Sequence, residues 1–332
     1  MKNLAVFSGL LALVVLSCTE QPADRHSALI ATGISVAKGT EIVCVDIDSG
    51  AVMNTTPIDC YLFGSTVYDP TTKGYGFVDC HTTFNLINPE SGKLIKSIKL
   101  PGNVTHAVID AKDNLLIGRY ATMIYEEDPD TIDTKSAKAG PPIYTHYIIR
   151  VNLSTGAIVS NNEIDLGDGA YATTYYYNEK EKHYVLYRAD KYLITINPAT
   201  AEIIKELYIG KTLSNSVYNP VNNTLICLSY STVDMSQAYS YSADSLSYST
   251  DDYIRTYLTV INHETGAVIS NNLIESGGGY QANIAGYDRE NNWYIAVNSK
   301  FEVVCFDVST GEVKKRYIPE DPMKDMKFWR RY

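Results

Sequence analysis

One eight-residue segment occurs almost unchanged twice in the chain, as TGAIVSNN at 155–162 and as TGAVISNN at 265–272. Each copy belongs to a longer pattern in which an apolar run leads into a short polar turn, and a second apolar run follows. Such runs around a turn rich in Asp, Asn and Gly are typical of a β-hairpin. Six of these turns align, and their last residues are Gly50, Gly92, Gly156, Ala201, Gly266 and Gly311. The sequence therefore predicts a fold assembled from repeated hairpins.

A second hairpin pattern lies about 20 residues ahead of the turn in the short units, as in VYDPTTKGYGFV at 67–78 and GYDRENNWYIAV at 286–297. Two hairpins give four antiparallel strands, and a four-stranded repeat of about 45 residues has the length of one propeller blade. Five complete units follow a first unit with room for three strands, and the C-terminal MKFWRRY supplies a spare strand. We therefore expect an all-β, six-bladed β-propeller, its ring closed by the C-terminal strand. Seven blades are the alternative.

The N-terminus has the features of an export signal. Lys2 precedes an apolar run at 4–16 that is short for a membrane span. The segment VLSC resembles a bacterial lipobox, which implies that Cys18 carries a lipid; an ordinary signal peptide is the alternative. The expected organisation is a signal peptide at 1–17, a tether at 18–28 and a single propeller domain at 29–332, with insertions at about 126–145 and 233–254.

Charge narrows the range of partners. The formal net charge is −10, and no run of five or more Lys or Arg occurs. We therefore expect no nucleic-acid partner, and contact with the membrane through the lipid anchor only. Tyr is abundant, with 27 residues against 7 Phe and 2 Trp. Tyr suits both half-buried strands and ligand contacts.

The cysteines fall into two groups. Cys44 and Cys305 occupy the same place in the matching segments IVCVDIDSG and VVCFDVSTG, and are expected to be small core residues. If 60–68 and 74–80 form a hairpin, Cys60 lies roughly opposite positions 80–82. The geometry then allows a disulfide bond between Cys60 and Cys80, of the kind that exported proteins form.

The repeated pattern, an apolar run, then INPxTG and a further apolar run, with YDP ahead of it, resembles the repeats of YVTN/YncE-like and quinoprotein-like β-propellers. The resemblance covers nearly all of the chain after the signal, and it implies a fold without specifying an activity. With the lipobox and the Tyr content, the chain is also similar to envelope lipoproteins of Bacteroidetes. Some of those capture nutrients at the cell surface, vitamin B12 among them. No residue here identifies a corrinoid site.

Two long insertions indicate where a binding site is expected. The segments at 126–142 and 233–253 both join the second and third strands of a unit, so both should leave from one face of the ring. The first strands of the units begin on that face, and long loops on a rigid scaffold are where function concentrates. The candidate ligand-binding residues there are Asn103, His106, Asp168, Tyr171, Thr212, Tyr239, Tyr241, Tyr248, Tyr280 and Gln281.

No catalytic constellation stands out. The 6 His residues are scattered, without a pair at metal-ligand spacing, and no nucleophile elbow is present. With only 2 Trp, the Trp-rich docking of quinoprotein dehydrogenases is absent. The sequence therefore predicts no catalytic residue, metal or cofactor.

These patterns favour a non-enzymatic binding protein. It is expected to capture a small ligand (a nutrient, glycan or cofactor) or a protein partner on the insertion-bearing face. The expected location is the cell envelope, as an outer-membrane lipoprotein on the periplasmic or surface side, either monomeric or in a transporter-associated complex. The alternatives are a propeller enzyme of the lactonase or lyase type, with Asp168 and His106 as candidate groups, and a structural envelope component.

Overall fold

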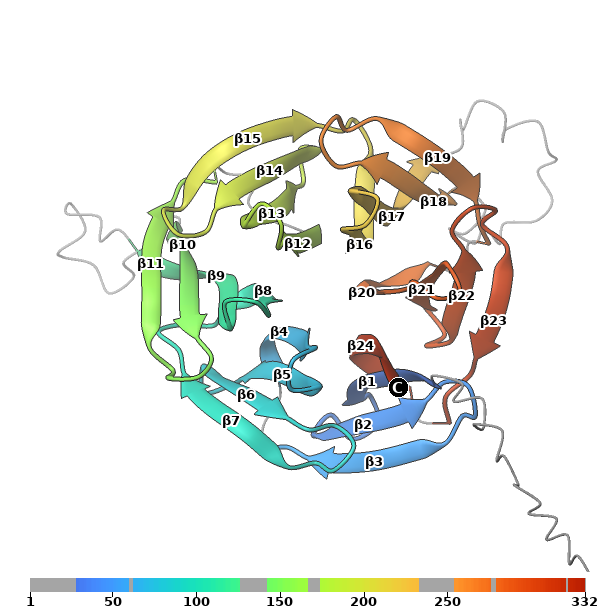
Figure 1. Ribbon diagram of the computed structural model, residues 1–332, viewed down its shortest axis with the longest axis horizontal. Coiled ribbons are helices and arrows are strands. Elements are labelled where there is room, and N and C mark those ends of the chain that lie inside the picture. Colours follow the sequence, from blue (N-terminus) through green and yellow to red (C-terminus); the bar gives the residue numbers. More distant parts are fainter. Residues whose placement is uncertain are drawn as a thin grey trace, which may run out of the picture.

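Six four-stranded antiparallel sheets form a closed ring in the computed structural model of the chain (Figure 1). The structure describes residues 28–59, 62–125, 142–166, 174–232, 254–275, 279–320 and 322–331. Every regular element in these ranges is a β-strand. The prediction of an all-β propeller with six blades, rather than seven, is confirmed.

Each blade has four strands, here called a to d from the axis to the rim. From a to d, blade 1 consists of β24 (Met323–Arg331), β1 (Ala28–Ser35), β2 (Glu41–Asp46) and β3 (Val52–Pro57). Blade 2 consists of β4 (Leu62–Asp69), β5 (Gly74–Asp79), β6 (Thr83–Ile87) and β7 (Leu94–Lys99). Blade 3 consists of β8 (Thr105–Asp110), β9 (Leu115–Tyr125), β10 (Pro142–Asn152) and β11 (Ile158–Ile164).

Blades 4 to 6 continue the ring in the same order. Blade 4 consists of β12 (Thr174–Asn178), β13 (His183–Arg188), β14 (Tyr192–Asn197) and β15 (Glu202–Tyr208). Blade 5 consists of β16 (Thr212–Asn219), β17 (Thr224–Thr232), β18 (Ile254–Asn262) and β19 (Val268–Leu273). Blade 6 consists of β20 (Tyr280–Asp288), β21 (Trp293–Asn298), β22 (Val303–Asp307) and β23 (Val313–Tyr317). The a–b and c–d turns lie at one end of the ring, called the a–b end. The b–c and d–a connections lie at the opposite end.

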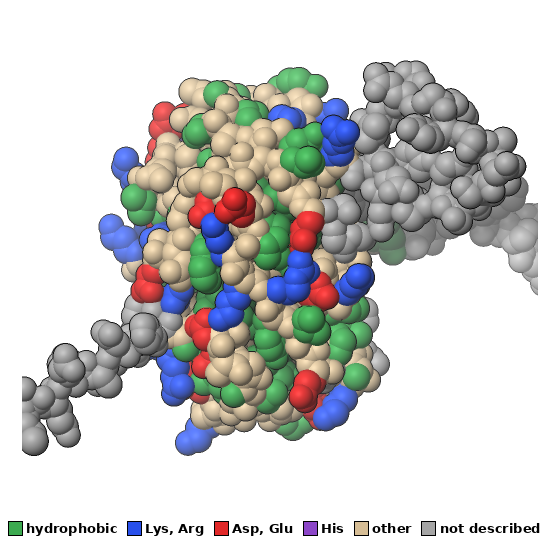
Figure 2. Space-filling view, turned by 90° about the vertical axis from the view of Figure 1, so that its right-hand side faces the viewer, with side chains coloured by type: hydrophobic (Ala, Val, Ile, Leu, Met, Phe, Trp, Pro, Cys, Tyr) green, Lys and Arg blue, Asp and Glu red, His purple; other side chains and the backbone are tan. Residues whose placement is uncertain are grey.

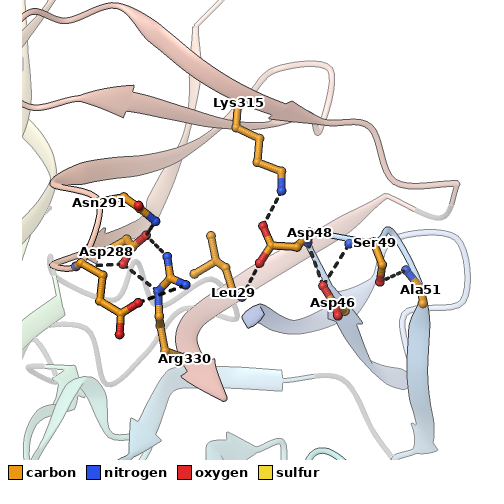
Figure 3. Close-up of polar contacts among 10 residues, drawn as sticks. Leu29, Asp46, Asp48, Ser49, Ala51, Asp288, Asn291, Lys315 and Arg330 are labelled. Atoms are coloured by element: carbon orange, nitrogen blue, oxygen red, sulfur yellow. Dashed lines mark hydrogen bonds and ion pairs between the residues drawn. The ribbon is translucent and has the colours of Figure 1, made fainter. Parts of the chain in front are cut away.

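The C-terminal strand closes the ring, as predicted. β24 pairs antiparallel with β1, with Trp329 opposite Ile30. At the seam with blade 6, the guanidinium of Arg330 donates from Nε to Asp288 over 2.8 Å, and a second nitrogen forms an ion pair with the same carboxylate (Figure 3). Lys315 of β23 pairs with Asp48 of blade 1. The first and last blades are thus joined by charged contacts as well as by packing.

The six aligned turns are all c–d hairpins. The residue that ends each turn has a left-handed backbone, with φ of 75° at Gly50, 74° at Gly156 and 61° at Ala201. The Asp or Asn that opens the turn fixes it with its side chain, as where Asn152 accepts the amide of Thr155 at 2.8 Å. This Asx turn explains why the sequence repeats so closely at these points.

The core lies between neighbouring blades. Between blades 2 and 3, for example, Val78 and Phe84 pack with Leu116 and Val151, all fully buried. Cys44 and Cys305 are buried and free, as expected for small core residues, and Cys227 is buried and free as well. Cys80 is disulfide-bonded; its expected partner, Cys60, lies outside the described residues, so that pairing stays a prediction.

Five of the six inner strands carry an irregularity that interrupts their pairing with the b strand; β12 of blade 4 pairs with β13 without a shift over its described residues. In blades 3, 5 and 1 the bulge contains a residue with left-handed backbone: His106 (φ 54°), Asn215 (φ 51°) and Asp325 (φ 53°). Each of these residues stands two positions before one that faces the central opening. The bulges therefore set which inner-strand side chains reach the axis.

The wall of the ring carries charges of both signs. In the side view, basic and acidic side chains alternate with hydrophobic ones, and neither sign forms a continuous patch on the face shown (Figure 2). Hydrophobic residues of the outermost strands contribute to this wall, such as Ile269 at 60 % exposure. Within the described ranges, no helix has the length and hydropathy needed to cross a membrane.

Candidate functional site

A central cavity of about 380 Å³ lies at the a–b end of the ring. All six inner strands, or the turns that follow them, contribute to its lining; Figure 1 shows these strands surrounding the axis. The lining includes Tyr68, Tyr175, Tyr176, Tyr177, Tyr218, Ser216, Val108, Val217, Ala285, Glu179, Arg289 and Lys327. Its size falls within the range of small-molecule sites.

The tyrosines come from a repeated feature of the sequence. Tyr68, Tyr177 and Tyr218 each stand directly before the Asp or Asn that opens an a–b turn. That Asp or Asn folds back on the turn, as Asn219 accepts the amide of Val221 at 3.1 Å. The turn chemistry therefore holds the preceding Tyr at the end of the inner strand, beside the cavity.

Hydrogen bonds and stacking fix the rings of Tyr176, Tyr177 and Tyr218. Tyr176 and Tyr218 stack with centroids 4.8 Å apart, and both lie against His263. The Tyr177 hydroxyl donates to Asp110 at 2.7 Å, and the Tyr218 hydroxyl donates to Asn223 at 2.8 Å. The wall formed by blades 4 and 5 is thus rigid before any ligand arrives.

The titration behaviour of the wall keeps it uncharged. Burial raises the pKa of Tyr68 to about 12, with smaller contributions from Asp69 and Glu90. Burial also raises the pKa of Tyr218 and, strongly, that of Tyr176. Burial lowers the pKa of His263, whose Nδ1 shares a hydrogen bond with the Tyr176 hydroxyl. At neutral pH the wall therefore offers phenol rings rather than phenolates.

One hydroxyl of the lining is unused. The Ser216 Oγ atom is buried and has no hydrogen-bond partner among the described residues. A buried hydroxyl without a partner costs stability, and such groups in native proteins mark places where water or a ligand completes the bonding. Ser216 is therefore the lining residue whose hydroxyl has a hydrogen bond left to make.

A second cavity of about 420 Å³ adjoins the first at blade 1. Blade 1 has no a–b turn, because its a strand ends the described chain and its b strand begins it. The space is lined in part by Leu29, Phe328 and Trp329, and it shares Tyr68 and Arg289 with the central cavity. Tyr68 and Trp329 stack with centroids 5.4 Å apart and so separate the two spaces.

Five of the residues predicted from sequence lie at the opposite end of the inner strands. Asn103 and Thr212 are exposed, and His106 is half-buried with its ring edge-on to Tyr175, 5.0 Å away. The Gln281 carbonyl accepts the Asn215 side chain at 2.7 Å. Tyr280 donates to the Glu275 carbonyl at 2.8 Å, and its ring lies against Phe306. These residues share one end of the ring, while their binding role stays a prediction.

The other predicted site residues cannot be placed. Asp168, Tyr171, Tyr239, Tyr241, Tyr248 and the lipidation residue Cys18 lie outside the described residues. Within the described part of the chain, no group of three or more His, Cys, Asp or Glu side chains is arranged to hold a metal ion.

Sequence reasoning missed the residues of the central cavity. A signal was present, since Tyr recurs before the a–b turn in VYDP, YYYN and VYNP. Lys327 carried no such signal, because it belongs to the C-terminal strand and has no counterpart in the aligned repeat.

Together these features define a six-bladed β-propeller with a preformed, tyrosine-lined cavity on its axis. No protein-family model and no curated protein matches the sequence. Among solved structures, a protein of unknown function from Bacteroides caccae is similar over 88 % of this chain and 93 % of its own, with 15 % identity and a TM-score of 0.51. BamB from Moraxella catarrhalis is similar over 86 % of this chain and 69 % of its own, with 11 % identity and a TM-score of 0.40. At such identities the likeness shows the fold alone.

Proposed function

We propose that this protein is an exported, lipid-anchored binding protein that holds a small ligand in the central cavity. The observation that carries the proposal is the preformed aromatic wall, in which Tyr176, Tyr177 and Tyr218 are already fixed by neighbouring groups. Rings that are ordered in advance lose little entropy when a ligand binds. The unused Ser216 hydroxyl adds a polar contact.

The composition of the lining supports binding over catalysis. Its acidic member, Glu179, is exposed and lies on the a–b turn of blade 4. General acid–base chemistry needs a titratable group whose pKa is matched to its task and which reaches the reacting atoms. The phenols of the lining have raised pKa values and serve instead as donors and stacking surfaces. A lactonase or lyase activity remains the alternative from sequence.

The anchor would orient the cavity toward the membrane. β1 begins at Ala28, opposite Arg331, and so starts at the a–b end. Ala28 is ten positions after Cys18, and an extended chain of that length spans at most about 35 Å. A lipid on Cys18 would therefore hold the a–b end within that distance of the bilayer. The insertion-bearing end would then face away, where a protein partner could reach it.

The family and the capture surface expected from sequence remain proposals. The repeat pattern supports kinship with YVTN/YncE-like envelope propellers, and the insertions support a contact surface at the opposite end. We place the small-ligand site in the central cavity because its tyrosines are already held in position by neighbouring groups.

A thermal-shift screen tests the proposed function. The purified protein is heated with corrinoids, haem, oligosaccharides and small organic acids, beside a variant whose cavity is filled by Ala285→Trp. A ligand at a hundred times its dissociation constant adds about 2.7 kcal/mol to the free energy of unfolding. We expect at least one compound to stabilise the wild type and not the filled variant. A compound that stabilises both equally binds elsewhere and would count against the cavity.

The anchor is tested separately. Cells are grown with an alkyne fatty acid, and labelling of the wild type is compared with that of Cys18→Ala. We expect the label on the wild type only. An unlabelled wild type that is still exported would support the ordinary signal peptide instead.

A further inference from the structure

The central cavity has two chemically different sides. Tyr175, Tyr176 and Tyr218 come from blades 4 and 5, while Lys327 comes from blade 1 and Arg289 follows the inner strand of blade 6. In a six-bladed ring, blade 4 stands across the axis from blade 1 (Figure 1). The tyrosines of blades 4 and 5 therefore face Lys327 and Arg289 across the axis, while Tyr68 of blade 2 lies on the cationic side.

Lys327 is a departure from the internal symmetry of the ring. In blades 3, 5 and 1, the second residue after the left-handed bulge residue lines the cavity: it is Val108, Val217 and Lys327, respectively. Two equivalent positions thus carry the apolar side chain that a narrow axial space favours. The third position carries an ammonium instead, on a side chain that is half-buried at the cavity.

The two cations lack ion-pair partners in the described part of the chain. Neither Lys327 nor Arg289 takes part in an ion pair there, although Lys327 interacts at longer range with Asp325 on its own strand. Other basic residues at this end are paired, as Arg330 is with Asp288 and Lys182 with Asp110. Glu179, the acid of the lining, belongs to blade 4 and so to the aromatic side.

We infer that the cavity selects an organic anion with a flat apolar body. Its carboxylate, sulfonate or phosphate group would lie against Lys327 and Arg289, and its rings would lie on the tyrosine wall, with Ser216 as a further donor. Stacking on Tyr needs close contact with a ring face, and charge pairing with Lys or Arg favours an anion on the other side of the cavity, so a ligand with both features at opposite ends fits best. This inference rests on the proposed function, that the cavity holds a ligand.

A matched pair of fluorescent probes tests the inference. 8-Anilinonaphthalene-1-sulfonate is an aromatic anion, and N-phenyl-1-naphthylamine is the same ring system without the sulfonate. Each is titrated into the wild type, Lys327→Met and Arg289→Gln. We expect the anion to bind once per protein and to lose about tenfold in affinity with Lys327→Met, and about threefold with Arg289→Gln. The neutral probe should change by less than twofold.

Two further variants distinguish a failure of the charge selectivity from a failure of the cavity as the binding site. Lys324→Met removes a charge from the same strand outside the cavity lining and should leave both probes unaffected. Ala285→Trp fills the cavity and should abolish binding of both. If Lys327→Met leaves the anion unaffected while Ala285→Trp abolishes it, the charge selectivity is wrong and the proposed function stands. If Ala285→Trp leaves both probes bound, the cavity is not the site and both proposals fail.

Discussion

The hydroxyl of Tyr184 donates to the backbone carbonyl of His106 across the interface between blades 4 and 3, over 2.6 Å. Tyr184 is fully buried, and His106 is the left-handed residue of the inner-strand bulge. The same relationship joins Tyr75 to the Asp325 carbonyl at 2.9 Å, and Tyr294 to Asn215. The b strands of the even blades thus hold the bulges of the odd blades. This hydrogen bond therefore recurs at every second interface of the ring.

Removing one of these donors tests the relationship. Tyr184→Phe leaves the carbonyl of a strained residue without its partner, and we expect a loss of about 1–3 kcal/mol in the free energy of unfolding. Tyr208→Phe, at a residue 58 % exposed, serves as the control and should change stability by under about 0.5 kcal/mol. Urea unfolding of both variants gives the answer. Equal stabilities would show that the bulges hold without the tyrosine.

The seam between the last blade and the first predicts a pH dependence. Burial alone would raise the pKa of Asp288, but hydrogen bonds from Arg330 and Asn291 outweigh it and lower that pKa. The ionised carboxylate therefore stabilises the fold above about pH 4, and this contribution is lost as the pH falls through the lowered pKa.

Arg330→Met measures that contribution. It leaves a buried carboxylate unpaired, and we expect a cost of about 3 kcal/mol at pH 7. The difference from the wild type should shrink as the pH falls, because the unpaired Asp288 of the variant takes up its proton at a higher pH than the paired Asp288 of the wild type. Thermal unfolding between pH 3 and pH 7 follows it, and a difference that stays constant over this range would contradict the assignment.

The backbone of the c–d turns predicts that Gly→Ala and Ala→Gly substitutions there change stability by different amounts. Gly156 has a φ of 74°, and an added Cβ would meet Ile98 at an ordinary 3.6 Å, so Gly156→Ala tests backbone strain alone. We expect it to cost about 1 kcal/mol. Ala201→Gly relieves the same strain but loses a buried methyl, so its net effect should be under about 0.5 kcal/mol. Denaturant unfolding of the two variants separates these effects. Equal losses in both would mean that the turn backbone is not what the glycines serve.

The disulfide prediction concerns Cys60. Cys80 is disulfide-bonded, while Cys44, Cys227 and Cys305 are free. Peptide mapping without reductant should recover a cross-linked fragment that contains Cys60 and Cys80 and that separates on reduction. We expect Cys80→Ser to lower the free energy of unfolding by about 3 kcal/mol, because the bond between Cys60 and Cys80 would no longer close a loop in the unfolded chain. Recovery of Cys60 as a free thiol would refute the pairing.

Local chemistry made most of the fold predictable. The Asx turns that end at Gly156 and Gly266 recur in the sequence because each hairpin needs the same side-chain bonds and the same left-handed residue. Six such turns and a spare C-terminal strand were enough to predict six blades and their closure.

The residues that line the cavity could not be predicted from the aligned repeats in the same way. Side chains along an inner strand point to its two faces in strict alternation only until the bulge. In blade 3, the register of β8 against β9 shifts between Thr105 and Val108. An extra residue there exchanges the two faces of the strand, so the side chains beyond it reach the axis in a different register. The partners that fix the wall, such as His263 for Tyr176, lie 87 positions away in the sequence.

The most direct test compares the two ends of the ring with one probe. 8-Anilinonaphthalene-1-sulfonate is titrated into Ala285→Trp, which fills the cavity at the a–b end, and into a variant in which residues 233–253 are replaced by a four-residue turn. We predict that the filled variant loses binding and that the shortened variant keeps the affinity of the wild type. The reverse result, with binding lost on shortening and kept on filling, would place the site on the insertion-bearing end and contradict the account.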